Sequence, residues 1–282
     1  MNLEQETKFI LKKYNITANK NYGQNFLIDE YTVSSIVEKA NVSKDDLIIE
    51  IGPGLGTLTS ILLEKAGKVI CVELDPKMIE IIKDRFSLYD NFEFIHDDIL
   101  KVDLKKLISE NSNFNNVKVV ANLPYYITTP IIMKLLEEKL NLTSITVMVQ
   151  KEVAERLAET PGGKDTGAIT YSINYYTNPQ IILNVSKDCF IPSPKVDSAV
   201  IQLEVLNTPK IKVSDENLFF KIIKLAFLQK RKTLINSLSN SGLQSKDFLE
   251  KMLNDLSINS KVRAEQLSLE DFGKITDYIK NA

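Results

Sequence analysis

LIIEIGPGLGTLT, residues 47–59, joins an apolar run to a glycine-rich turn and the beginning of a helix. The run 47–52 is typical of a buried strand that ends in glycine. Gly52, Gly54 and Gly56 have no Cβ, so the backbone there can turn tightly and approach a ligand closely. Helical spacing follows over 58–67. The stretch therefore predicts a strand, a turn and a helix in succession.

The same alternation continues along the chain. Further apolar runs are KVICVELD (68–75), FEFIHDDI (92–99), NVKVVAN (116–122) and SITVMVQ (144–150), with helical patterns at 58–67, 76–88 and 129–140. Nearly all-apolar strands that alternate with helices predict a Rossmann-like α/β domain, whose parallel sheet is covered on both faces. Two later runs, 180–190 and 195–206, alternate more and have no helix between them, so we expect an antiparallel pair closing the sheet.

The character of the sequence changes after Leu206. Residues 207–216 are polar and read as a linker, in which Asp215 is placed to cap a following helix. Segments 217–242, 246–257 and 267–280 then have helical patterns without a strand signal. We therefore predict an α/β domain over 1–206 and a small all-α domain over 207–282.

Composition narrows the class of protein. The chain has 282 residues, of which 44% are apolar and 26% charged, as in ordinary globular proteins. It has neither an apolar run near the ~20 residues of a membrane span nor the apolar segment of a signal peptide. We therefore expect a cytoplasmic protein without a membrane partner. One histidine and two scattered cysteines make no zinc pattern, so we assign no metal.

Charge is distributed unevenly. The whole chain carries a net charge of −2, which argues against indiscriminate coating of nucleic acid. Residues 205–282 carry +4, whereas the preceding 204 residues carry −6. A basic tail on an acidic body suggests a local anionic partner. On charge alone, however, a solvated helical face is the better interpretation.

Polar residues at the strand ends suggest a nucleoside site. Glu73 ends the second strand, 21 residues after Gly52, where a carboxylate accepts hydrogen bonds from ribose hydroxyls. The glycine spacing is GxGxG rather than the dinucleotide GxGxxG, which favours S-adenosylmethionine, a ligand with a ribose and no phosphate. Asp98 follows the third strand and could accept from an adenine amine. Alone it would be an ordinary strand-end aspartate, but with Gly52 and Glu73 it favours a nucleoside site.

VVANLPYYITTP (119–130) ends the fourth strand at the same predicted edge. Its chemistry suits methylation of an aromatic exocyclic amine, because the Asn122 oxygen and a backbone carbonyl beside Pro124 could accept the two N–H groups. Proline fixes φ and so holds that carbonyl, and Tyr125 could stack on the base. The competing interpretation is a proline turn with two packed tyrosines.

Eight segments together resemble the KsgA/RsmA family of ribosomal RNA adenine N6,N6-dimethyltransferases. They occur in this order: GQNFLID (23–29), EIGPGLGTLT (50–59), VELD (72–75), DDIL (97–100), ANLPYYIT (121–128), QKEVAERL (150–157), FIPSPKVDSAV (190–200) and AFLQKRKTLINSL (226–238). The resemblance implies a class I S-adenosylmethionine-dependent methyltransferase fold. It also implies that residues 1–30 contribute to the donor site. That site would contain Asn25, Leu27, Gly52, Glu73, Asp98 and Asn122, and the glycine turn adds Gly54.

The resemblance further implies roles at the target. Asn122 and Pro124 would hold the amine, and Tyr125 and Phe190 would sandwich the adenine. Phe190 lies in a loop stiffened by prolines, and a core aromatic is the competing interpretation. The implied substrate is two adjacent adenosines in a hairpin near the 3′ end of small-subunit (16S) rRNA, dimethylated within an assembling 30S particle. We expect the protein to act as a monomer.

Two local features bear on this resemblance. The family often has tyrosine where this chain has Thr166, and we expect only a change in loop packing. Lys230, Arg231 and Lys232 head a helix, and with the basic tail they predict contacts to RNA phosphates, which position a substrate without reading its sequence. A solvated helix face is the competing interpretation of this triplet.

Three other functions compete. A large-subunit (23S) rRNA adenine dimethyltransferase of the macrolide-resistance type would share the donor site, but such enzymes are strongly basic. A non-catalytic ribosome assembly factor could use the same fold to bind RNA. An NAD-dependent oxidoreductase is disfavoured by the glycine spacing and by the lack of a well-placed histidine.

Overall fold

The computed structural model describes residues 2–19, 23–163, 165–229 and 231–282. The chain divides into two compact units. The first comprises residues 1–155 and 179–205, and the second comprises 156–178 and 206–282. Within the described ranges, no helix is long and apolar enough to cross a membrane.

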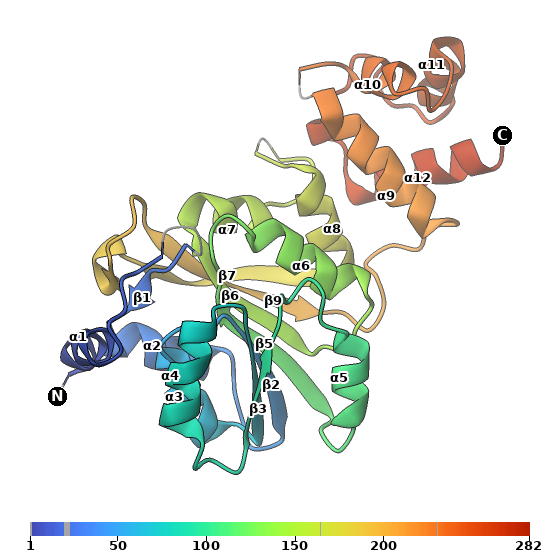
Figure 1. Cartoon of the computed structure of the whole chain (residues 1–282). Coiled ribbons are helices and arrows are strands. Elements are labelled where there is room, and N and C mark those ends of the chain that lie inside the picture. The colour runs from blue at the N-terminus through green and yellow to red at the C-terminus, as the bar shows by residue number, and fades with distance from the viewer. Residues whose placement is uncertain (1, 20–22, 164, 230) are drawn as a thin grey trace. The chain divides into compact units, whose positions relative to one another are not determined.

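A seven-stranded sheet forms the centre of the first unit, with the order β4-β3-β2-β5-β6-β9-β7 (Figure 1). The strands are β2 (Asp46–Ile51), β3 (Lys68–Glu73), β4 (Phe92–His96), β5 (Asn116–Asn122), β6 (Ser144–Gln150), β7 (Thr177–Val185) and β9 (Ser198–Val205). β2 to β6 pair in parallel, and β9 runs antiparallel to β6. The predicted Rossmann-like fold, a mostly parallel sheet closed by later strands, is confirmed.

Helices precede or connect these strands. They are α1 (Leu3–Lys13), α2 (Glu30–Lys39), α3 (Thr57–Lys65), α4 (Pro76–Phe86), α5 (Leu104–Glu110), α6 (Thr128–Glu137) and α7 (Lys151–Ala158), with the short 3₁₀ helix η2 (Lys187–Cys189). Asp75 caps α4 by accepting from the Lys77 N–H, and Pro76 occupies the first helical position, as is usual for proline. α3 and α4 pack on β3, and the strand residues they cover are almost entirely buried.

Two short strands form a separate two-stranded ribbon outside this sheet. β1 (Phe26–Leu27) pairs antiparallel with β8 (Phe190–Ile191), so that Leu27 lies opposite Phe190. Both of these side chains are buried in the same apolar cluster. The ribbon thus ties the loop that precedes α2 to the loop that precedes β9.

The second unit is helical. It contains α8 (Ala168–Tyr176), α9 (Glu216–Ala226), η3 (Phe227–Gln229), α10 (Leu234–Asn240), α11 (Lys246–Asp255), η4 (Ala264–Gln266) and α12 (Leu269–Lys280). Its core includes Tyr171, whose ring meets that of Phe272 edge-on at 5.0 Å and whose hydroxyl donates to the Ala264 and Leu267 carbonyls. These contacts explain why 156–178, predicted as part of the first domain, groups with the C-terminal helices.

The single helix expected over 217–242 is wrong. α9 ends at Ala226, and α10 begins only at Leu234, where the Thr233 hydroxyl caps it by accepting from the Asn236 N–H. A capping threonine in the middle of a helical pattern signals such a restart. The break allows buried residues on both helices to join one cluster.

Candidate active site

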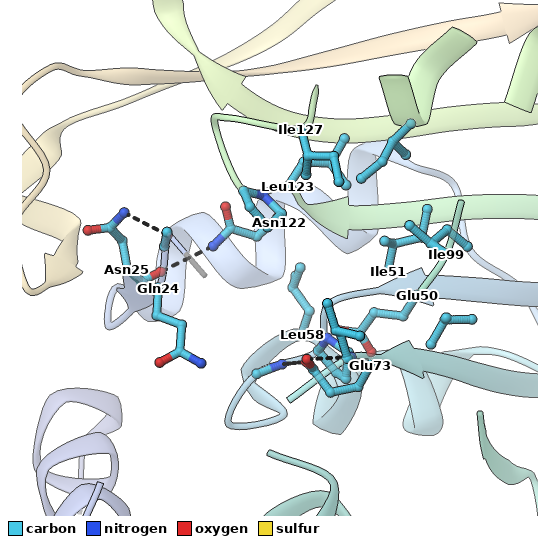
Figure 2. A pocket seen from close by; sticks show the side chains of 18 of the residues that line it. Gln24, Asn25, Glu50, Ile51, Leu58, Glu73, Ile99, Asn122, Leu123 and Ile127 are labelled. Carbon is cyan, nitrogen blue, oxygen red and sulfur yellow. Dashed lines mark hydrogen bonds between the residues drawn. The ribbon is translucent and has the colours of Figure 1, made fainter. Parts of the chain in front are cut away.

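A cavity lies at the carboxyl edge of the sheet, with about 1100 Å³ of space that protein atoms do not fill, part of it open to solvent (Figure 2). Parallel strands bring their carboxyl ends to one edge, which is where such sheets bind ligands. Nine of the predicted site residues line the cavity. They are Asn25, Leu27, Gly52, Gly54, Glu73, Asp98, Asn122, Pro124 and Tyr125.

The glycine turn after β2 forms one wall. Gly52 has a φ of +67°, and a Cβ there would meet no atom within 4 Å, so its backbone faces open space. Gly56 begins α3 with a φ of +81°, and a Cβ there would lie 2.3 Å from the Phe86 ring. The turn therefore needs glycine for two separate reasons, the left-handed backbone at Gly52 and Gly56 and the close packing at Gly56.

Glu73 is held in a fixed orientation at the end of β3. Its Oε1 accepts from the Leu74 and Asp75 N–H groups at 2.8 Å each, and its Oε2 accepts from the Gly54 N–H at 3.3 Å. Burial raises the pKa of this carboxyl, while the backbone hydrogen bonds lower it in part. The result is an oriented acceptor beside the glycine turn (Figure 2).

Asp98 lies two residues after β4 and is half-buried. Its Oδ1 accepts from the Leu100 N–H at 3.0 Å, which fixes the carboxyl at the edge of the cavity. Ile99, the next residue, is buried and also lines the cavity. An apolar side chain can pack on an adenine ring, and a carboxylate beside it can accept from the adenine amine.

Asn122 ends β5 and is linked to the N-terminal loop. Its Nδ2 donates to the Asn25 carbonyl at 3.4 Å, and the Asn25 Nδ2 donates to the Gly23 carbonyl at 3.1 Å (Figure 2). This hydrogen bond fixes the orientation of the amide, and Oδ1, the side-chain atom that accepts hydrogen bonds, is available to a ligand.

The turn after β5 leaves one backbone carbonyl that can accept a hydrogen bond from a ligand. The Pro124 carbonyl already accepts from the Ile127 N–H and the Thr128 hydroxyl, both at 3.2 Å. The Leu123 N–H donates to the Met148 carbonyl, which fixes that peptide against β6. The carbonyl beside Pro124 that lies outside the turn is therefore that of Leu123.

The two predicted aromatic residues lie in different surroundings. Tyr125 is half-buried at the cavity and shares a hydrogen bond of 2.7 Å with the buried Ser198 hydroxyl, and burial raises the pKa of its phenol. Phe190 is only 3% exposed, packs in the apolar core and is not among the cavity-lining residues. The structure therefore brings Tyr125 but not Phe190 to the site, and the sandwich stays a prediction.

Sequence reasoning missed Glu50. This residue lines the cavity and is 1% exposed, and its Oε2 accepts from the Thr59 hydroxyl at 2.7 Å and the Cys71 thiol at 3.4 Å. Burial raises its pKa to about 7. The signal was a single acidic residue in the otherwise apolar run 47–51. A buried carboxylate at a cavity favours a cationic group on the ligand.

The predicted RNA-binding triplet is described in part. Lys230 lies outside the described residues, while Arg231 and Lys232 are exposed in the turn before α10. As for metals, the described ranges hold no group of three or more His, Cys, Asp or Glu side chains that could bind an ion.

Comparison with known proteins identifies sequence relatives over nearly the whole chain. Residues 15–281 match the family described as "Ribosomal RNA adenine dimethylase". The chain is 51% identical over 276 residues to "Ribosomal RNA small subunit methyltransferase A" of Clostridium acetobutylicum, covering 98% of this chain and 99% of the relative. It is 48% identical over 274 residues to the protein of that name from Alkaliphilus oremlandii, covering 97% and 96%.

Solved structures give a consistent result. A dimethyladenosine transferase from Plasmodium falciparum matches with a TM-score of 0.74 and 26% identity, covering 89% of this chain and 95% of that one. The 23S rRNA methyltransferase ErmE matches with a TM-score of 0.69 and 23% identity, covering 91% and 100%, a likeness that shows the fold alone.

Proposed function

The chain belongs to the ribosomal RNA adenine dimethylase family, and we propose that it methylates N6 of two adjacent adenosines near the 3′ end of small-subunit (16S) rRNA. The donor is S-adenosylmethionine, and the product is N6,N6-dimethyladenosine within an assembling 30S particle. The proposed enzyme works as a monomer in the cytoplasm. The observation that carries the proposal is the pair of acceptors, the Asn122 Oδ1 and the Leu123 carbonyl, beside a cavity suited to a nucleoside.

The cavity residues fit the donor. The open backbone at Gly52 admits a ligand, the oriented Glu73 carboxylate can accept from ribose hydroxyls, and Asp98 can accept from an adenine amine. Glu50 supplies a buried acid for the ammonium of the methionine part. When bound, the donor supplies an electrophilic methyl group on a positively charged sulfur.

The chain's task at the target is positioning. The adenine amine is a weak nucleophile because its lone pair is delocalised into the ring. Acceptance of both N–H groups by Asn122 and Leu123 would hold the nitrogen so that its lone pair points towards the methyl. Tyr125 would stack on the extruded base. As the new N–C bond formed, the C–S bond of the donor would break and the positive charge would pass from sulfur to N6. The cationic N6 would be acidic enough to lose a proton to water, so orientation and fitted electrostatics are sufficient and no strong base is required.

RNA contacts outside the cavity belong to the proposal as well. Arg231 and Lys232 are exposed cations on a positively charged stretch of sequence, and they suit phosphate oxygens. Lys230 is assigned the same role from the sequence alone. Such contacts would orient the particle without selecting the base that is methylated.

The test uses purified protein, labelled S-adenosylmethionine and unmethylated small subunits, with large subunits as the parallel substrate. We expect N6,N6-dimethyladenosine, identified by mass, from small subunits only. Product from large subunits would assign the protein to the resistance-type activity. Binding of the donor without any product would make the assembly-factor function the better one.

A further inference from the structure

Tyr126, the second tyrosine of NLPYY, has no part in the mechanism above although it lines the same cavity. Its side chain is 60% exposed, whereas Tyr125 is half-buried with its hydroxyl bonded to Ser198. A large aromatic side chain that stays exposed at the rim of a binding cavity forgoes burial in the core. Such rings are common where a protein meets a flat ligand.

The surroundings of Tyr126 hold it beside the target-amine site. Tyr125 and Tyr126 are the central residues of the turn closed by the Ile127 N–H and the Pro124 carbonyl, so the turn places the two rings next to each other in the chain. At Gly23, where φ is +61°, a Cβ would lie 3.4 Å from Cδ1 and 3.5 Å from Cε1 of the Tyr126 ring. One edge of the ring therefore lies against the backbone of Gly23.

That backbone belongs to the loop that also contacts Asn122. The Gly23 carbonyl accepts from Asn25, and the Asn25 carbonyl accepts from Asn122 (Figure 2). The ring of Tyr126 and the amide of Asn122 are thus supported by the same three residues, 23–25. A base bound at Asn122 would have this second ring at the edge of its pocket.

We propose that Tyr126 is the stacking surface for the base that neighbours the target adenosine in the RNA strand. This inference rests on the proposed function. Extrusion of the target unstacks its neighbour, and an aromatic ring next to the pocket offers that neighbour a new partner. Every base has a π-face, so the ring would accept any neighbour. It would favour a purine because a purine offers a larger stacking area, not because of hydrogen bonds.

The first experiment compares Tyr126→Ala, Tyr126→Phe and Tyr126→Leu. Stacking on a protein aromatic implies that Tyr126→Ala raises KM for unmethylated small subunits about five- to a hundredfold. Tyr126→Phe should stay close to wild type, whereas Tyr126→Leu, which keeps bulk without a π-face, should resemble Ala. Affinity for S-adenosylmethionine, measured by calorimetry, should be unchanged in all three. A loss of donor affinity in Tyr126→Ala would overturn the proposal and assign the ring to the donor site.

The second experiment combines these variants with a changed substrate. In reconstituted small subunits, one of the two adjacent target adenosines is replaced by uridine, which stacks poorly, and methylation of the remaining adenosine is followed. If Tyr126 stacks on this base, the wild type loses affinity and Tyr126→Ala loses little more, so the two penalties are not additive. Additive penalties would refute the contact. Failure of the proposed function would be seen separately, because the wild type would then yield no dimethyladenosine from unmodified small subunits.

Discussion

Asp46 and Glu50 are two carboxylates on one strand, and they have opposite surroundings. Both lie on β2 and are almost completely buried, at 0% and 1% exposure. Asp46 accepts from the Lys118 ammonium at 2.8 Å and from the Ser43 N–H at 2.7 Å. Glu50 accepts only from a hydroxyl and a thiol, and no ion pair to it is found among the described residues.

The neighbouring strand β5 repeats this contrast. Lys118, near its beginning, is paired with Asp46 and donates to the Asn41 carbonyl, whereas Asn122, at its end, lines the cavity. Lys118 near the amino end is therefore paired with Asp46, of which Oδ1 has no hydrogen-bond partner in the part of the chain that the structure describes, whereas Glu50 and Asn122 towards the carboxyl end line the cavity. A polar side chain that lines a cavity is available to a ligand, whereas an ion pair inside the protein serves the fold. The two ends should accordingly respond differently to substitution.

The largest effect is expected for Asn122→Ala. Loss of one of two acceptors for the target amine should lower kcat about a hundred- to a thousandfold, the range for removal of one positioned hydrogen-bonding group. Binding of small subunits should be nearly unchanged. Asn116→Ala, at the other end of β5, is the matched control and should retain activity. Methyl transfer by Asn122→Ala at close to the wild-type rate would refute the role of Asn122.

Lys118→Met should affect stability rather than catalysis. It would leave the Asp46 carboxylate buried without its cation, which typically costs about 3–5 kcal/mol. Urea unfolding measures this loss, and activity per folded molecule should be preserved. The double variant Asp46→Asn/Lys118→Met removes the stranded charge and should recover most of the stability. A reduced kcat in fully folded Lys118→Met would show that the amino end also serves the reaction.

The sequence predicted correctly those features that depend on one strand alone, namely where the strand begins and which residues follow its end. β5 and β6 have the predicted bounds, 116–122 and 144–150, because their apolar runs end abruptly in polar residues. The position of the predicted donor-site residues at the cavity could be foreseen for a related reason, since parallel strands bring Gly52, Glu73 and Asn122 to one edge.

Tertiary contacts determined what the sequence did not reveal. The assignment of 156–178 to the helical unit depends on Tyr171, whose partners lie some 90 residues further along the chain. The buried position of Phe190 depends on the pairing of β8 with β1, two strands of two residues each, which are too short to show a period. Glu50 was overlooked because a lone acid in an apolar run indicates function only when the cavity beside it is known.

The smallest of the predicted changes tests Glu50 directly. Its pKa is about 7 in the folded protein and 4.5 as the ordinary value, so the folded state binds more protons between these values. Stability is therefore full below pH 4.5 and falls as the pH rises towards 7. Glu50→Gln cannot ionise, so it should match the wild type near pH 4 and be more stable at pH 8, by up to about 3 kcal/mol. Urea unfolding at both pH values measures the difference. An equal difference at both would mean that Glu50, like Asp46, has a cation to stabilise its charge.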